Sequence, residues 1–152
     1  MSRHRRHPNM SLPGFLVFIC LALPVKAIKI LLRYRRNLKL SSIDKMTGLE
    51  FERCVATALG RQGYKKVKFT ERYDYGIDIV ANKNGIRWGI QVKRHGGLVK
   101  ANAVRQAVTA LKKYNCTRAM VVSNSYFSKY AAELAKCNDC VLVNRRTLAK
   151  WL

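Results

Sequence analysis

The chain has 152 residues, which is enough for one domain and a short appendage but too few for a multidomain enzyme. Thirty Lys and Arg residues against eight Asp and Glu residues give a formal net charge of +22, which argues against an acidic protein that binds cationic partners. Such an excess favours a polyanionic partner, either nucleic acid or an anionic membrane surface. The five cysteines form an odd and widely spaced set, which argues against a disulfide scaffold and indicates a reducing compartment.

We interpret residues 1–42 as a basic N-terminal segment with its own role. An apolar run over 12–25 follows three arginines, continues over 27–32 and ends before a second basic cluster. We favour a membrane-anchoring helix over about 12–32, because a span needs about twenty mainly apolar residues and the two lysines in the run can extend towards the interface. More basic residues follow the run than precede it, which predicts a C-terminal domain on the cytoplasmic side of the membrane.

Two alternatives for the same run remain open. The basic start, the length of the run and the small residues after it also fit a secretory signal peptide. A short apolar run can instead lie on a membrane surface without spanning it. If the run does not span, we expect a soluble cytoplasmic protein.

From residue 43 onwards the pattern predicts one α/β domain, residues 43–152. Apolar residues recur at helical spacing over Lys45–Gln62 and predict the first helix. Alternating lysines and apolar residues predict a half-exposed strand over Tyr64–Thr70. Its lysines are either a solvated edge that discourages pairing with another sheet, or contacts to a phosphate backbone.

A β-hairpin follows, and the domain is organised around it. The strands Gly76–Ala81 and Ile86–Lys93 flank the turn sequence Asn82–Gly85, which ends in Asn-Gly, the strongest short hairpin signal. The rest of the chain predicts a helix over Asn102–Tyr114 and a strand over Arg118–Ser123, after which helices and strands continue to alternate. The later elements are a helix containing Ala131, Leu134 and Ala135, a strand over Cys140–Val143 and a helix over Arg145–Leu152. This order predicts a mixed β-sheet with helices on both faces.

The polar residues of the hairpin are the candidate site. Side chains alternate along a strand, so a turn of two or four residues places Asp78 opposite Gln91 or Gly89, on the same face as Lys93. The reverse face is expected to carry the apolar residues Ile77, Ile79, Ile90 and Val92. A carboxylate, an amide and an ammonium on one face of an apolar hairpin cost desolvation free energy unless they are paired or solvated, so such groups are usually kept for chemistry. The alternative is a structural ion pair between Asp78 and Lys93.

A pair of cysteines, Cys137 and Cys140, forms a lone C-x-x-C motif. Zinc would need two more ligands at suitable spacing, and the sequence supplies neither a second pair nor a nearby histidine. We therefore expect a structural role for this pair.

The hairpin residues and the first helix resemble those of a known family. Gly76-Ile77-Asp78 followed after a hairpin by Gln91-Val92-Lys93 resembles the core of the PD-(D/E)xK nucleases, and more narrowly the Mrr-type restriction endonuclease domain, in which Gln stands in place of the second acid. The opening Gly48-Leu49-Glu50-Phe51-Glu52 is similar to the first helix of that domain. The resemblance covers 43–152 and implies a restriction-endonuclease-like fold, preceded here by the N-terminal hydrophobic helix. It also implies that Glu52 reaches the metal site and that the backbone carbonyl of Val92 is a further metal ligand.

The expected activity is therefore that of a metal-dependent deoxyribonuclease of the type IV, Mrr-like restriction class. Phosphodiester hydrolysis needs a divalent cation, Mg²⁺ or Mn²⁺, and Mg²⁺ prefers hard oxygen ligands such as the Asp78 carboxylate. Lys93 would orient or deprotonate a water, or stabilise the charge that develops on the phosphate. Gln91 offers a neutral oxygen, which should weaken metal binding or leave the site dependent on DNA.

Double-stranded DNA is the expected substrate. The candidate DNA-binding residues are Lys66, Lys68, Arg72, Arg94 and His95. Double-strand cleavage would need two such sites, for which a homodimer is one solution. Two other functions stay open: a Holliday-junction-resolvase-like nuclease, and a membrane-tethered DNA-binding module whose nuclease site has decayed.

Overall fold

The computed structural model of the chain describes residues 25, 27–32, 40–71 and 75–152. The chain divides into two units, residues 1–35 and 36–152. In the first unit, residues 27–32 are helical and exposed. The predicted anchor over 12–32 otherwise lies outside the described residues, so it stays a prediction. Among the described residues, no helix combines the length and the apolar character that crossing a bilayer requires.

The second unit is an α/β domain whose element order agrees with the order predicted from the sequence. In chain order its elements are α2 (Gly48–Arg61), β1 (Lys65–Phe69), β2 (Ile79–Lys83), β3 (Ile86–Lys93), α3 (Ala101–Thr109), β4 (Arg118–Ser123), α4 (Lys129–Cys137), β5 (Val141–Val143) and α5 (Arg145–Trp151). Residues 40–45, ahead of α2, are also helical.

The strands form one mixed five-stranded sheet in the order β1-β2-β3-β4-β5. β1, β2 and β3 pair antiparallel, and β3, β4 and β5 pair parallel. The two parallel connections pass through α3 and α4, as crossover connections require. Strand β1, with its lysines, is therefore an edge strand.

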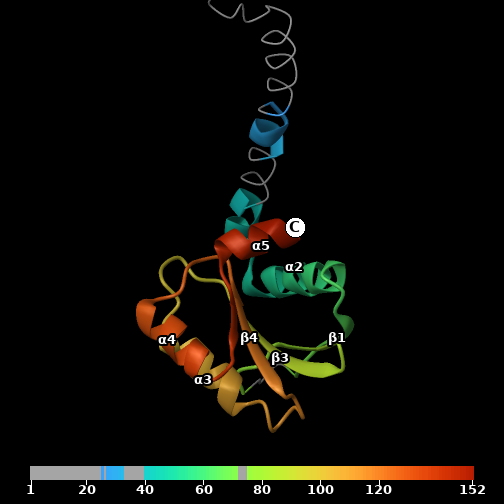
Figure 1. Ribbon diagram of the computed structural model, residues 1–152, viewed down its shortest axis with the longest axis vertical. Coiled ribbons are helices and arrows are strands. Elements are labelled where there is room, and N and C mark those ends of the chain that lie inside the picture. Colours follow the sequence, from blue (N-terminus) through green and yellow to red (C-terminus); the bar gives the residue numbers. More distant parts are fainter. Residues whose placement is uncertain (1–24, 26, 33–39, 72–74) are drawn as a thin grey trace, which may run out of the picture. The chain divides into compact units, whose positions relative to one another are not determined.

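Helices cover both faces of the sheet (Figure 1). One face packs against α2 and α5, where Phe51 and Leu148 meet Ile90 and Val122. The other face packs against α3 and α4 through small residues, among them Ala107. β4 runs between these layers and is almost entirely buried, which explains its continuous apolar sequence.

The first helix begins later than the apolar periodicity predicts, because a capping box interrupts it. The Thr47 side chain accepts from the Glu50 backbone N–H at 3.3 Å, and the Glu50 carboxylate accepts from the Thr47 backbone N–H at 2.7 Å. This reciprocal pair satisfies two backbone donors at the start of α2, so the helix starts at Gly48 and not at Lys45.

Candidate active site

The hairpin turn determines which residues face one another. Asn84 and Gly85 both have positive φ, 52° and 75°, and the closing pair is Lys83 with Ile86, so the turn contains two residues and is of the I′ type. Ile79 pairs with Ile90, and the Asp78 backbone N–H donates to the Ile90 carbonyl at 2.9 Å. The regular register therefore ends at Ile79, because Ile90 pairs with Ile79 and its carbonyl also accepts from Asp78. Val80 lies opposite Gly89, which excludes the predicted register that pairs Asp78 with Gly89, and the pairing of Asp78 with Gln91 stays a prediction.

Asp78, just before the start of β2, is held from both sides. Its carboxylate Oδ2 accepts from the Val92 backbone N–H on β3 at 2.5 Å. Its backbone carbonyl accepts from the Thr70 N–H, which follows β1, at 3.0 Å. The side chain is half-buried. A carboxylate has about four lone-pair sites, so the Asp78 side chain can bind more than one partner at a time.

Gln91 and Lys93 come together on the face that α3 covers. Gln91 is one of the few buried polar residues, with 2% of its surface exposed. With its carboxamide oxygen turned towards Lys93, it accepts from Lys93 Nζ at 3.2 Å and donates to the Ala103 carbonyl at 2.5 Å. In this orientation the same Gln91 oxygen also accepts from the Gln106 carboxamide at 3.1 Å. The Gln91 amide therefore orients the ammonium of Lys93 from within the protein.

Ile77 does not lie where strand alternation predicts. The sequence predicts Ile77 on the apolar reverse face with Ile79, but Ile77 packs with Val80 and Cys116 on the opposite face. The reason is that β2 begins only at Ile79, and Gly76 has a φ of 104°, so the alternation does not extend to Ile77. The other predicted reverse-face residues, Ile79, Ile90 and Val92, do share one core cluster.

Glu52 comes from the helix layer on the other face of the sheet. It follows Phe51, which is fully buried on α2, and its own side chain is half-buried. α2 packs against the face that carries Ile79 and Val92. The role of Glu52 at the site, and that of the Val92 carbonyl, stay predictions.

The segment that follows Lys93 carries two of the predicted DNA-binding residues. A pocket of about 370 Å³ opens beside it and is lined by Lys93, Arg94, His95 and Lys100, together with residues of α3. Its lining is therefore strongly basic, as a phosphate-binding surface requires. Lys66 and Lys68 lie elsewhere, on β1, and Arg72 lies outside the described residues.

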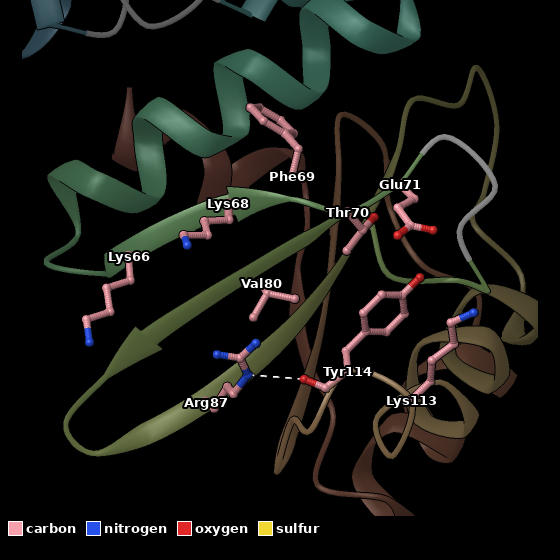
Figure 2. Close-up of a pocket in the computed structure, with 9 residues that line it drawn as sticks. All are labelled: Lys66, Lys68, Phe69, Thr70, Glu71, Val80, Arg87, Lys113 and Tyr114. Atoms are coloured by element: carbon pink, nitrogen blue, oxygen red, sulfur yellow. Dashed lines mark hydrogen bonds between the residues drawn. The ribbon is translucent and has the colours of Figure 1, made fainter.

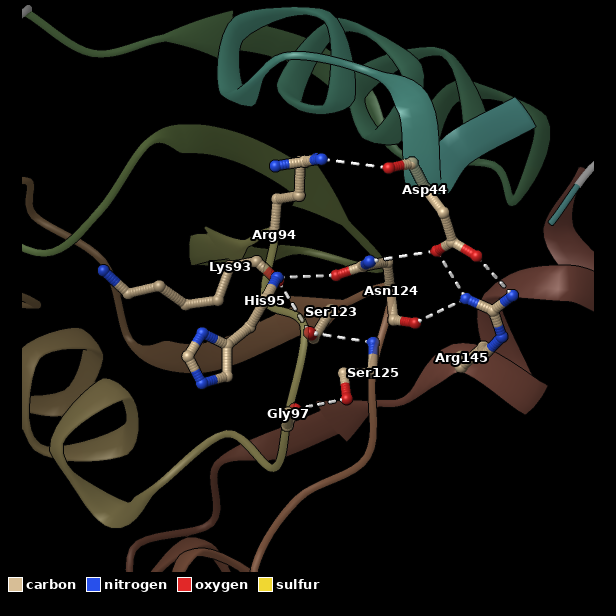
Figure 3. Close-up of polar contacts among 9 residues, drawn as sticks. All are labelled: Asp44, Lys93, Arg94, His95, Gly97, Ser123, Asn124, Ser125 and Arg145. Carbon is tan, nitrogen blue, oxygen red and sulfur yellow. Dashed lines mark hydrogen bonds and ion pairs between the residues drawn. The ribbon is translucent and has the colours of Figure 1, made fainter. Parts of the chain in front are cut away.

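Polar residues at the end of β4 and directly after it hold the Lys93 segment in place (Figure 3). Ser123 Oγ donates to the Lys93 carbonyl at 2.6 Å, Asn124 Oδ1 accepts from the His95 N–H at 2.8 Å, and Ser125 Oγ donates to the Gly97 carbonyl. Three successive residues, 123–125, thus bind every second residue of the segment 93–97. The sequence patterns above do not assign this role, although a Ser-Asn-Ser run at the carboxyl end of a buried parallel strand is a signal for it.

An ion pair joins this loop to the start of the domain. Arg145, at the start of α5, contacts the Asp44 carboxylate at 2.6 and 2.7 Å, and Asn124 Nδ2 donates to the same carboxylate at 3.1 Å. Arg94 donates to the Asp44 backbone carbonyl at 2.9 Å. The residues just before α2 are therefore connected to the segment after Lys93. Sequence patterns miss this network because Asp44 and Arg145 are 101 residues apart.

This ion pair predicts a pH-dependent contribution to stability. The bidentate Arg145 contact is the largest cause that holds the pKa of Asp44 below its ordinary value of 3.8. A carboxyl group whose pKa is lowered by folding stabilises the fold above its unfolded pKa and loses that contribution as the pH falls through its folded pKa. We expect Asp44→Asn to lower Tm at pH 7, with a difference from wild type that shrinks below about pH 4.

Thermal melts of both proteins from pH 7 to pH 3 measure this difference. Both partners are partly exposed, at 26% for Arg145 and 41% for Asp44, so the difference should be modest and should decrease at high salt. A difference that is constant across the pH range would contradict the ion pair as its cause.

The oxygen donors of the site suit a hard divalent cation. The described residues contain no group of three His, Cys, Asp or Glu side chains that could hold a metal. Mg²⁺ does not need such a cage, because it typically binds one or two carboxylates and keeps several waters. The half-buried Asp78 carboxylate, next to a basic pocket that suits phosphate, fits this mode of binding.

Comparisons with known proteins give one family match and several similar folds. Residues 43–152 match the family model of the Mrr catalytic domain, described as a restriction endonuclease. No curated protein gives a significant match. The crystal structure of AF1548, a protein of unknown function, is similar in fold, with a TM-score of 0.54. The two sequences are 22% identical, and the match covers 61% of this chain and 55% of that one.

Two restriction enzymes are also similar in fold. The DNA modification-dependent restriction endonuclease AspBHI is 14% identical with a TM-score of 0.59, over 78% of this chain and 35% of that one. The MspJI restriction endonuclease, solved with a 27-mer oligonucleotide, is 17% identical with a TM-score of 0.50, over 83% of this chain and 30% of that one. The chain spans less than two thirds of each of these proteins, and at such identities the likeness shows the fold alone.

Proposed function

The chain belongs to the restriction endonuclease family of the Mrr catalytic domain, and on that premise we propose that it is a Mg²⁺-dependent deoxyribonuclease of the type IV class, acting on modified or foreign DNA. The observation that carries the proposal is that the Asp78 carboxylate binds the backbone of β3 at Val92, between Gln91 and Lys93. The Asp78 carboxylate accepts from Val92 at 2.5 Å, and Lys93 Nζ lies 3.2 Å from the Gln91 carboxamide.

Each residue of the site has a proposed task. Asp78 would hold the cation, with Glu52 as a second carboxylate and the Val92 carbonyl as a further ligand. When bound, the cation neutralises the phosphate and makes a coordinated water more acidic. Lys93 would donate to the attacking water or to a phosphate oxygen. Because Gln91 is neutral, the site carries one negative charge fewer than one with a second acid, so metal affinity should be low and should increase when DNA is bound.

The surroundings of Lys93 supply the binding surface for DNA. Arg94 and His95 follow it directly, and Lys100 lines the same pocket. Contacts from these side chains to phosphates would release counterions, so binding should not depend on sequence and should weaken steeply as salt increases. The hydrogen bonds from Ser123 and Asn124 hold the backbone of this segment, which lowers the entropy cost of binding.

A plasmid assay tests the proposal directly. The purified full-length chain is incubated with supercoiled plasmid, methylated and unmethylated, with Mg²⁺, with Mn²⁺ and with EDTA. We expect nicked or linear products only with a divalent cation. A labelled four-way junction in the same assay tests for resolvase activity, which would appear as preferred cleavage of the junction over linear duplex. DNA binding with no cleavage of any substrate would favour a DNA-binding module with a decayed site.

A further inference from the structure

A second basic pocket opens on the sheet, away from Lys93. It has a volume of about 700 Å³ and lies between β1, the hairpin and the segment after α3 (Figure 2). Four of the described residues that line it are cationic: Lys66, Lys68, Arg87 and Lys113. One, Glu71, is a carboxylate. The pocket therefore suits an anion that is larger than a single small ion.

The backbone of β1 is distorted in the part that supplies two of these cations. Lys65 pairs with Asn82, but Lys68 pairs with Val80, so β1 contains one extra residue between the two pairs. Lys66 within this β-bulge has a φ of 52°, a left-handed conformation that a long side chain rarely adopts. Backbone strain of this kind is found preferentially at functional sites.

The bulge has a direct effect on where the lysines point. Residues directly opposite each other in an antiparallel pair project to the same face, so Lys68 projects to the face of Val80, which lines the pocket. Lys66 extends along the same side of the strand in Figure 2. A glycine or an asparagine would fit the backbone at position 66 with less strain, yet this position carries a lysine.

The other two cations are held in place by neighbouring groups. Arg87 Nε donates to the Tyr114 carbonyl at 3.1 Å, which directs the guanidinium along the pocket wall. Lys113 Nζ lies 3.4 Å from the centre of the Tyr75 ring, in a cation–π contact. Cations that are oriented before binding lose less conformational entropy when an anion arrives.

The pocket lies next to the candidate active site. Thr70 lines it, and the Thr70 backbone N–H donates to the Asp78 carbonyl at 3.0 Å. On the other side, Gln106 lines the Lys93 pocket and lies against Gly76. The Gly76–Asp78 segment therefore lies between two basic pockets.

We propose that the pocket of Lys66, Lys68, Arg87 and Lys113 binds the phosphodiester backbone of DNA at a second point, away from the phosphate that is cleaved. The identity of the ligand rests on the proposed function. In this proposal the bulge at Lys66 directs the lysines to the DNA backbone. DNA would then be held on both sides of Asp78, and binding through this pocket would not require metal.

The test measures DNA binding by the full-length chain in EDTA, which prevents metal-dependent cleavage during the measurement. We compare wild type with Lys66→Asn and with the double variant Lys66→Asn/Lys68→Ala, on a labelled duplex and on the matching single strand. Asn tolerates positive φ, so Lys66→Asn should keep or raise Tm while it weakens DNA binding severalfold. The slope of log affinity against log salt should become shallower by about 0.9 for each duplex phosphate that the variant no longer binds. A residue with a purely structural role would not combine unchanged Tm with a smaller salt slope.

Duplexes with neutral methylphosphonates at single positions locate the contact. Wild type should lose affinity at specific positions where the double variant does not, because the variant no longer contacts those phosphates. The control is Lys129→Ala/Lys136→Ala, which removes two exposed lysines of α4 and should retain sensitivity at these positions. If both pocket variants bind every duplex with the wild-type salt slope, the pocket does not contact DNA and this proposal fails, whether or not the protein cleaves DNA. If the phosphate pattern is found and no DNA is cleaved, the pocket stands and the nuclease proposal fails.

Discussion

Replacing Asp78 with Asn is expected to lower Mg²⁺-dependent DNA cleavage by about 10²- to 10⁴-fold, while the affinity for DNA is retained or increases. Asn keeps the size of the side chain and an oxygen that can accept from the Val92 N–H, so the hairpin register should persist. The variant lacks the negative charge that would hold the cation. Because that charge also repels DNA phosphates, its removal should not weaken binding. Plasmid cleavage and duplex affinity, measured on the same preparation, separate the two effects.

The chain offers a closely matched control for this variant. Asp139 is exposed, lies between α4 and β5, and has a φ of 49°, which Asn also tolerates. Asp139→Asn makes the same chemical change far from the hairpin in sequence and should leave cleavage unchanged. Lys93→Ala should reduce cleavage as strongly as Asp78→Asn does. Full activity in both Asp78→Asn and Lys93→Ala would remove the proposed mechanism.

The hairpin shows what local sequence can predict. Asn84 and Gly85 both occupy positive φ, which two-residue hairpin turns require and which these residue types tolerate best. Once that turn is fixed, the register from Lys83–Ile86 to Ile79–Ile90 follows without any tertiary information. The mixed sheet follows similarly, because β4 is a continuous apolar run between two helices.

Contacts between distant segments are beyond local patterns. The hydrogen bonds from Ser123 and Asn124 to the Lys93 segment depend on how β3 and β4 align. The Asp44–Arg145 ion pair joins residues from opposite ends of the domain sequence. The β-bulge at Lys66 is also missed, since the sequence places a lysine where such a conformation favours glycine. These are the places where tertiary packing outweighs intrinsic preference.

Gly76 is a residue for which the structure gives a reason that the motif alone does not. Its φ of 104° is a conformation that L side chains rarely adopt, and a Cβ at this position would lie 2.6 Å from Gln106 Cβ and 2.8 Å from the Gln106 backbone carbonyl carbon and oxygen. The collision is therefore with the backbone of α3 as well as with a side chain, so repacking of side chains cannot relieve it. The segment that carries Asp78 fits against α3 only because this residue has no side chain.

We expect Gly76→Ala to destabilise the domain by about 3–5 kcal/mol, the sum of the strained φ and the overpacking, and to lower Tm by about 10 °C or more. Gly85→Ala is the matched control, because Gly85 also has a positive φ, 75°, but has open space around its Cβ position. It should cost only about 1–2 kcal/mol. Thermal melts of both variants measure the difference, which isolates the collision with α3. Gly76→Ala should also reduce cleavage at temperatures where it remains folded, because the shift of its segment displaces Asp78 from the Val92 N–H. Equal decreases of Tm in the two variants would mean that this segment does not pack against Gln106 as described.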